Sequence, residues 1–386
     1  MRAIIKPDAQ QKIELLGELA QLDCDGEPVL SNQQRQKRGF LSDSIVQVQR
    51  PDGPMTVLRT LQSSVCEKDC HYCPFRAGRS RTQRVSFSPD ELASEFDAMQ
   101  AGGVVKGLFL SSGIVGGGVK AMDKMLATAE ILRRKYDYRG YVHLKIMPGS
   151  ERAQLEQAIR LADRISINLE GANAKRLAVL APQKDMRGEL LPVIHWMRQI
   201  AREMPWQVKI PSLVTQFVVG PAGESDQEIL TGVDWLYRRR TLSRAYYSRF
   251  NPITDTPLEN IAPTPPIRER RLYQADWLLR FYGFKLSELP FDPNGALPAN
   301  ADPKLLWAAK HLSERPVEIN LAPRSELLRV PGIGPKSADA ILQARRQERL
   351  KDLSQLKKTG AVINRASSFI LLDGHRPPRQ LRLPAT

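Results

Sequence analysis

The chain is poor in cysteine: it has four in 386 residues, and three of these lie between positions 66 and 73. So few thiols, so unevenly spread, argue against a secreted disulfide framework and favour a reducing compartment. No stretch approaches the roughly 20 apolar residues that a membrane span requires. The start of the chain also lacks the apolar run of a signal peptide. We therefore expect a cytoplasmic protein.

Acidic residues are in deficit. Asp and Glu number 42 against 57 Lys and Arg, which leaves a net charge of +15. About half of this excess falls in residues 316–386, where 13 basic residues face 6 acidic ones. A protein this basic usually meets a polyanion, and nucleic acid is the first candidate. A chain of this length predicts two or three domains.

The three clustered cysteines, Cys66, Cys70 and Cys73, follow the spacing CxxxCxxC, with the aromatic Tyr72 before the last of them. Thiolates this close can converge on one metal centre. A 4Fe–4S cluster takes four thiolates, so three would leave one iron open to another ligand. Two other interpretations remain: a zinc knuckle with His71 as the fourth ligand, and an incidental trio of cysteines.

From Met55 onward the chain alternates strands and helices. A helix is also expected over residues 8–22, and residues 25–54 are expected to be irregular. The expected strands cover residues 55–61, 104–110, 142–147, 164–169, 209–219 and 245–250. The expected helices begin at Ser88, which with Glu91 forms a capping box, and then cover 121–136, 151–161, 188–202, 225–239 and 267–282.

Repeated β–α units with short connections specify a parallel sheet with right-handed crossovers. The predicted fold class is therefore α/β, and six units fit a partial (β/α)6 barrel. In such barrels the chemistry lies at the carboxyl ends of the strands. The cysteine loop follows the first expected strand, in agreement with that rule.

Polar residues occupy one face of the fourth expected strand. Strand alternation places Ser166, Asn168 and Glu170 opposite three apolar residues. A strand buried on both faces is normally almost entirely apolar, so this pattern favours a ligand-lined interior. A partly solvated barrel mouth would explain it as well. The third strand similarly presents Lys145 and His143, and a single histidine of this kind is more often an interior hydrogen-bonding residue than a ligand.

The cysteine loop, CxxxCxΦC with Φ aromatic, resembles that of the radical S-adenosylmethionine (SAM) superfamily, whose core is a partial barrel. The resemblance implies that Cys66, Cys70 and Cys73 hold a 4Fe–4S cluster, that SAM binds its fourth iron, and that an electron donor such as flavodoxin or ferredoxin serves it. It also implies SAM contacts from Tyr72, Ser111, Ser112, Gly113, Lys145, Ser166, Asn168, Glu170 and Gly220. The turn at 111–113 departs from the family's Gly-Gly-Glu-like pattern because it has no carboxylate.

The sequence near the end of the chain resembles a tandem helix-hairpin-helix DNA-binding domain. Its first turn reads Gly332-Ile333-Gly334, followed by Lys336 and Ser337. Glycine lets the backbone approach a phosphate, and the start of the next helix presents free N–H groups to it. A second hairpin is expected near residues 356–365, with one glycine. An ordinary helical interaction domain is the alternative.

These patterns divide the chain into an N-terminal extension (1–54), a barrel (55–284), a linker or cap (285–315), a helix-hairpin-helix domain (316–375) and a basic tail (376–386). The combination resembles radical SAM proteins assigned to DNA modification or repair. It implies that a 5′-deoxyadenosyl radical, formed from SAM, acts on a DNA substrate. Two alternatives stay open: a radical SAM enzyme acting on RNA or a small molecule with the tail as a docking module, and a non-enzymatic zinc-containing DNA-binding protein.

Overall fold

The structure, a computed structural model, describes residues 7–20, 44–50, 53–79 and 82–377. Cys24 and much of the expected N-terminal extension lie outside the described residues. The chain forms two compact units, one of residues 1–224 and 235–264 and one of residues 225–234 and 265–386. Within the described part of the chain, no helix has the length and apolar character to cross a membrane.

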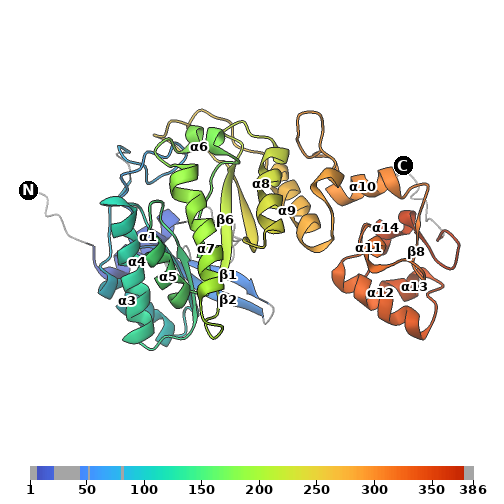
Figure 1. Ribbon diagram of the computed structural model, residues 1–386, viewed down its shortest axis with the longest axis horizontal. Coiled ribbons are helices and arrows are strands. Elements are labelled where there is room, and N and C mark those ends of the chain that lie inside the picture. The colour runs from blue at the N-terminus through green and yellow to red at the C-terminus, as the bar shows by residue number, and fades with distance from the viewer. Residues whose placement is uncertain (1–6, 21–43, 51–52, 80–81, 378–386) are drawn as a thin grey trace, which may run out of the picture. The chain divides into compact units, whose positions relative to one another are not determined.

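A seven-stranded sheet, with its strands in chain order, forms the centre of the first unit (Figure 1). Six strands run parallel, as the partial (β/α)6 barrel requires, and one extra strand, β1, pairs antiparallel with β2. The strands are β1 (Ile45–Arg50), β2 (Gly53–Leu61), β3 (Gly107–Ser111), β4 (Tyr141–Lys145), β5 (Arg164–Ser166), β6 (Ser212–Val219) and β7 (Arg244–Arg249). The predicted fold class is confirmed.

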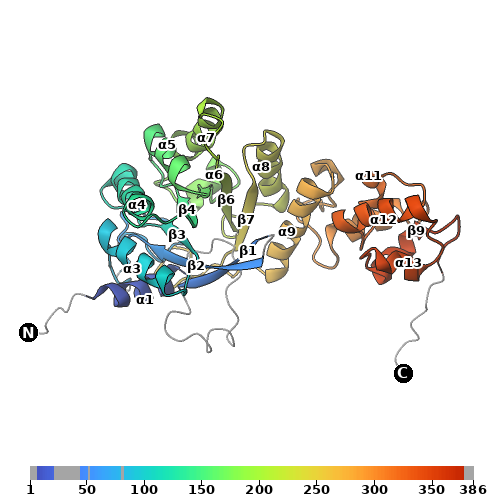
Figure 2. The same cartoon turned by 90° about the horizontal axis from the view of Figure 1, so that it is seen from below.

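Helices line one side of this curled sheet (Figure 2). Neighbouring helices α3, α4, α5 and α7 pack against one another in turn. The helices of this part of the chain are α1 (Ala9–Ala20), α3 (Pro89–Ala101), α4 (Gly117–Arg134), α5 (Arg152–Leu161), α6 (Ala174–Leu180) and α7 (Leu191–Glu203), and the residues of α8 (Asp226–Arg238) are divided between the two units. The expected capping box is present: the Ser88 hydroxyl accepts from the Glu91 N–H at 3.2 Å, and the Glu91 carboxylate accepts from the Ser88 N–H.

Three local expectations were wrong. Residues 45–50 form β1, although residues 25–54 were expected to be irregular. This strand is stabilised by hydrogen bonds to β2, and the local sequence does not predict that pairing. Helix α6 and the π-helical turn Met186–Leu190 were not predicted. The strand expected to reach Leu169 ends at Ser166, and Glu170 adopts a left-handed backbone with φ of 61°.

The second unit contains α9 (Pro266–Phe281), α10 (Pro303–His311), and two short hairpins of helices around a common core. The hairpin helices are α11 (Arg324–Leu327), α12 (Pro335–Gln347), α13 (Leu353–Lys358) and α14 (Ile363–Ala366), and the strands β8 (Val317–Glu318) and β9 (Ile370–Leu371) pair in parallel. Residues 285–315 include α10, whose Ala308 belongs to the same core as the hairpins. Arg329 adds to this packing by covering the Phe284 ring at 3.8 Å and pairing with Glu288.

Candidate functional site

The cysteine loop leaves the carboxyl end of β2 and is held by its own backbone and by Arg84. The guanidinium of Arg84 donates to the carbonyl oxygens of Ser64, Phe75 and Arg76, each at 2.8 Å. The Ser64 N–H donates to Val85 across the base of the loop. The charged guanidinium of Arg84 therefore satisfies three backbone carbonyl groups at once. These charge-assisted hydrogen bonds hold the two ends of the loop together.

Two residues between the cysteines attach the loop to neighbouring elements. The Glu67 carboxylate accepts from the N–H groups of Gly116 and Gly117, both at 3.0 Å, where α4 begins. The Nδ1 atom of His71 lies 2.9 Å from the Val179 carbonyl oxygen, so this nitrogen donates there. His71 does not line the cavity described next, which speaks against a zinc knuckle that uses this histidine.

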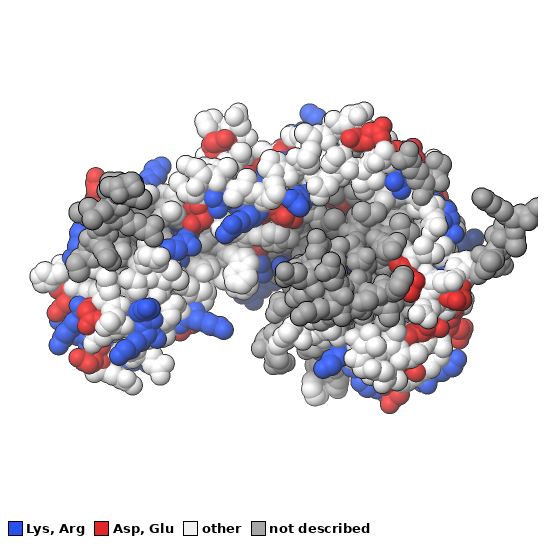
Figure 3. All heavy atoms as spheres, turned by 180° about the vertical axis from the view of Figure 1, so that it is seen from behind, with Lys and Arg blue, Asp and Glu red and all other residues white. Residues whose placement is uncertain are grey.

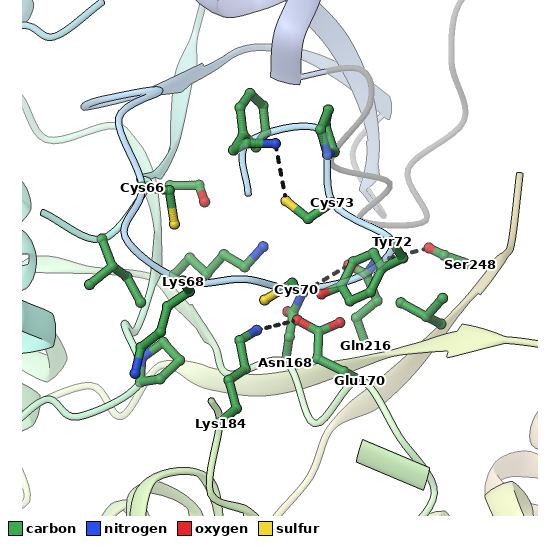
Figure 4. A pocket seen from close by; sticks show the side chains of 18 of the residues that line it. Cys66, Lys68, Cys70, Tyr72, Cys73, Asn168, Glu170, Lys184, Gln216 and Ser248 are labelled. Atoms are coloured by element: carbon green, nitrogen blue, oxygen red, sulfur yellow. Dashed lines mark hydrogen bonds and ion pairs between the residues drawn. The ribbon is translucent and has the colours of Figure 1, made fainter. Parts of the chain in front are cut away.

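The three cysteines line one cavity of about 350 Å³ at the carboxyl ends of the strands (Figure 4). Tyr72 lies on the same wall. Burial raises the pKa of the Cys70 thiol. The cavity is otherwise lined largely by apolar side chains, among them Ile114, Met147, Ile167, Val218 and Phe250.

Polar side chains from three successive strand ends cross the cavity floor. Asn168, Gln216 and Ser248 are linked by hydrogen bonds, 3.4 Å from Asn168 Nδ2 to Gln216 Oε1 and 3.0 Å from Gln216 Nε2 to Ser248 Oγ (Figure 4). Asn168 Oδ1 is buried and has no hydrogen-bond partner among the described residues. A buried carbonyl oxygen without a donor is costly, so this atom is suited to accept from a ligand hydroxyl.

A buried ion pair lies under the last two cysteines. Lys184 Nζ donates to Glu170 Oε1 at 2.9 Å, and both side chains are at least nine-tenths buried. Burial lowers the pKa of Lys184, but the Glu170 carboxylate and the nearby thiols outweigh this and raise the pKa above its ordinary value. Burial, followed by the charge of Glu170, raises the pKa of the Tyr72 hydroxyl, which stays protonated.

The turn after β3 also lines the cavity, with Ser111, Ser112 and Gly113, and lies beside the start of the cysteine loop. A Cβ atom at position 113 would lie 2.2 Å from the Val65 carbonyl oxygen, so only glycine allows the cysteine loop to pass. Lys145 lines the cavity from the end of β4. The sequence therefore located this turn correctly, although the reason for its glycine is packing against the loop.

Two residues expected at the cofactor do not line the cavity. Ser166 lies deeper in the barrel, 3.0 Å from Nε2 of His143, which stacks on Phe109 with 4.1 Å between ring centroids. Burial lowers the pKa of His143 well below its ordinary value, so the ring is neutral. Gly220 follows β6, and a Cβ there would meet the Thr264 hydroxyl at 2.0 Å.

Sequence reasoning missed Lys184, Lys68 and Ser248, which all line the cavity. Lys68 lies between Cys66 and Cys70, and this position alone could have predicted that it lines the cavity. Ser248 alternates with the apolar Tyr247 on the last strand, which is the same signal that revealed Asn168. Lys184 lies in an irregular segment after α6, and no sequence pattern points to it.

The expected DNA-binding residues lie at the turn of the first hairpin in the second unit and at the start of α12. Gly332, Ile333, Gly334 and Ser337 line a second cavity, and Lys336 does not. Gly332 has φ of 81°, and a Cβ there would lie 2.4 Å from the Val362 carbonyl oxygen. The Val362 N–H donates to the Gly332 carbonyl at 2.9 Å. This glycine therefore joins the two hairpins to each other.

Residues 62–236 match the model of the Radical SAM superfamily, and residues 313–366 match the helix-hairpin-helix motif. The first match spans the cysteine loop, β3 to β6 and every element that lines the polar floor except β7. The chain carries a radical SAM domain. This domain is a catalytic one, and its cofactors are a 4Fe–4S cluster and SAM.

The residues of the first cavity fit those cofactors. One loop supplies three thiols, one short of the four that a 4Fe–4S cluster takes, and Asn168, whose Oδ1 has no partner among the described residues, lines the same cavity. Cys66, Cys70 and Cys73 could therefore hold such a cluster.

Several solved structures are similar to the chain. HydG, an FeFe-hydrogenase maturase from Carboxydothermus hydrogenoformans, is 16% identical with a TM-score of 0.46, over 58% of this chain and 51% of its own. Methylornithine synthase (PylB) is 13% identical with a TM-score of 0.46, over 72% of this chain and 74% of its own. The chain thus spans about half the length of HydG. None of the curated proteins matches it.

Proposed function

We propose that the protein is a cytoplasmic radical SAM enzyme that modifies or repairs DNA, which its tandem hairpins bind. The observation that carries this proposal is the presence in one chain of a thiol-lined radical SAM cavity and a helix-hairpin-helix motif. The net charge of +15 supports a polyanionic substrate. Lys and Arg side chains are interspersed with Asp and Glu on the face in Figure 3. Charge alone therefore does not locate the DNA surface there.

A 4Fe–4S cluster held here would supply the electron for reductive cleavage of SAM into methionine and a 5′-deoxyadenosyl radical. The chain's own residues hold and enclose these groups. Cys66, Cys70 and Cys73 bind the cluster, and the hydrogen bonds of Arg84 and Glu67 keep their loop in place. Asn168 Oδ1 accepts a hydrogen bond from SAM, since it has no other donor among the described residues.

Two further features prepare the cavity for reactive chemistry. Lys184 and Glu170 balance each other's charge in the cavity wall, 2.9 Å apart. The apolar side chains around this pair exclude solvent that would quench a reactive species. Lys145 adds a positive charge to the cavity wall, which suits the carboxylate of a methionine moiety. An external reductant, such as flavodoxin or ferredoxin, completes the reaction.

The test is anaerobic reconstitution with iron and sulfide, followed by an assay of 5′-deoxyadenosine and of nucleoside composition with and without DNA. The proposal predicts that DNA increases 5′-deoxyadenosine formation and that digested DNA contains an altered nucleoside. Cys70→Ala is the matched inactive control. Formation of 5′-deoxyadenosine that responds to RNA and not to DNA would move the substrate to RNA. An absence of any response to either polymer would contradict a nucleic-acid substrate.

A further inference from the structure

The second cavity, in the second unit, has about 710 Å³ of space and belongs to no function yet assigned. Its walls come from three places: one face of α9, the start of α10, and the turns of both hairpins. Sites for small organic ligands occupy about 300–1,000 Å³. The cavity is therefore large enough for a nucleotide.

Helix α9 supplies an aromatic wall. Arg270, Tyr273, Gln274, Trp277 and Leu278 line the cavity at spacings of three and four, which places them on one helical face. Tyr282 extends this wall beyond the end of the helix. Trp277 is 50% exposed although it is a large apolar side chain. An indole left half-open on a cavity wall is a ready surface for stacking.

The hairpin turns form the facing wall, and they lie close to the end of α9. A Cβ atom at position 334 would be 3.2 Å from the Tyr282 hydroxyl oxygen. Gly360 of the second hairpin lines the same space as Gly334. The turn that the sequence marks for phosphate thus borders an open hollow that aromatic side chains of α9 also line.

Basic side chains outnumber acidic ones at this cavity, by three to two. Arg270, Lys304 and Arg365 line it against two acidic residues, Glu269 and Asp302. Asp302 is already paired with Arg365, and Lys304 donates to the Ile333 carbonyl at 2.6 Å. Arg270 is exposed. The first turn of α12, which includes Ser337 on the cavity wall, carries N–H groups that have no acceptor within the helix. An anion is favoured here.

We propose that this cavity binds an unpaired nucleotide of a nucleic-acid strand, with its base stacked on Trp277 and its phosphate near Arg270 and the start of α12. The inference rests on the proposed function and deepens it, because it names the form of nucleic acid that is recognised. In a duplex both faces of a base are covered by its neighbours. Only an unpaired base can offer a face to an indole, and stacking of this kind tolerates any sequence.

The experiment uses the full chain and four fluorescent probes of equal length: single-stranded DNA, blunt duplex DNA, duplex DNA with one unpaired nucleotide, and single-stranded RNA. Affinities are measured by anisotropy at one salt concentration. We expect the single strand and the duplex with an unpaired nucleotide to bind at least about 5-fold more tightly than the blunt duplex, the range that stacking of one base supplies.

Substitutions assign this preference to the cavity. Trp277→Ala should remove the preference, and Trp277→Phe should restore most of it. Trp206→Ala is the matched control, since Trp206 is 90% exposed and does not line the cavity. Arg270→Gln should weaken binding of every probe several-fold, whereas Lys310→Gln, an exposed residue away from the cavity, should change little.

The outcomes are separable. Equal binding of all probes by wild type and Trp277→Ala would overturn the inference and leave the proposed function standing. Binding of no probe would overturn both. A preference for single-stranded RNA over DNA, lost in Trp277→Ala, would support the cavity as a site for unpaired nucleotides and move the proposed substrate to RNA.

Discussion

Lys184 in the first unit and Lys304 in the second are both buried at a cavity wall, but their partners differ and their pKa values shift in opposite directions. In the radical SAM cavity, Lys184 is paired with the buried carboxylate of Glu170, and its pKa is raised. In the second unit, Lys304 faces a carbonyl oxygen and the Tyr282 ring, 4.4 Å away. Burial, reinforced by the charge of Arg365, lowers the pKa of Lys304 to about 7. A buried cation therefore keeps its charge only where a carboxylate is buried beside it.

The difference follows from how the cavities are built. The first is assembled from strand ends and loops that bring the Glu170 carboxylate next to the Lys184 ammonium group, so each charge is balanced there by the other. The second is assembled from helix faces and turns, where carbonyl oxygens and aromatic rings are the available partners. Four predictions test this comparison.

The largest effect is expected at the cysteines. Cys66→Ala, Cys70→Ala or Cys73→Ala should each abolish cluster binding and cleavage of SAM, because two thiols cannot hold a cluster that normally takes protein ligands at three or four irons. Iron analysis after anaerobic reconstitution should show about four irons per chain in wild type and almost none in the variants. Cys24→Ala should leave iron content unchanged. A stoichiometric zinc site without iron would contradict the assignment.

Breaking the buried pair should be next in size. Lys184→Met leaves Glu170 charged and alone, which should lower the free energy of unfolding by about 3–5 kcal/mol. The double variant Lys184→Met/Glu170→Gln should recover most of this loss. Lys68→Met removes a more exposed pair with Glu189, 3.6 Å long, and should cost less than about 1 kcal/mol. Urea denaturation of the cluster-free chain measures all three, and similar losses for Lys184→Met and Lys68→Met would contradict the comparison.

The stability of the second unit should depend on pH through Lys304. Its pKa in the folded state is about 7, against an ordinary value of 10.5. Between these values the unfolded chain binds the proton and the folded chain does not, so stability should rise with pH, by at most about 1.4 kcal/mol per pH unit. Below pH 7 both states are protonated and the full cost remains. The neighbouring charges are Arg365, Asp302 and Arg329.

This pH dependence can be measured by urea denaturation between pH 6 and 9.5. The fluorescence of Trp307 reports unfolding of the second unit in a variant whose other tryptophans are replaced by Phe. Trp307 packs against the core of the second unit. Lys304→Met should abolish the rise, and Lys310→Met should keep it. A rise of equal size in Lys304→Met would show that another group is responsible.

The smallest effect is expected at the polar floor. Asn168→Ala removes a partner of bound SAM and should weaken its binding about 5- to 20-fold, the worth of one hydrogen bond. Cluster content should stay near that of wild type. Ser166→Ala is the matched control, because Ser166 is buried against His143 and does not line the cavity. Equilibrium binding of SAM to the reconstituted protein distinguishes them, and equal losses would mean that the cavity extends to Ser166.

The sequence by itself determined the partial barrel and the cluster loop. Spacing alone brings Cys66, Cys70 and Cys73 together, since a short loop keeps its thiols close in any fold. Strand alternation identified Asn168 and Glu170, and the Ser88 capping box located the start of α3. These sequence patterns depend on residues close together in the chain, so they can be recognised without knowledge of tertiary contacts.

Tertiary structure decided the rest. Alternation implied that Ser166 shares a cavity with Asn168, but β5 ends at Ser166 and the left-handed Glu170 changes the direction of the chain. Lys184 reaches Glu170 from an irregular segment 14 residues later. In the second unit, α9 and the hairpin turns, more than 50 residues apart in sequence, form one cavity. Contacts between such distant residues depend on how helices, strands and loops pack together, and no periodic pattern in the sequence predicts that packing.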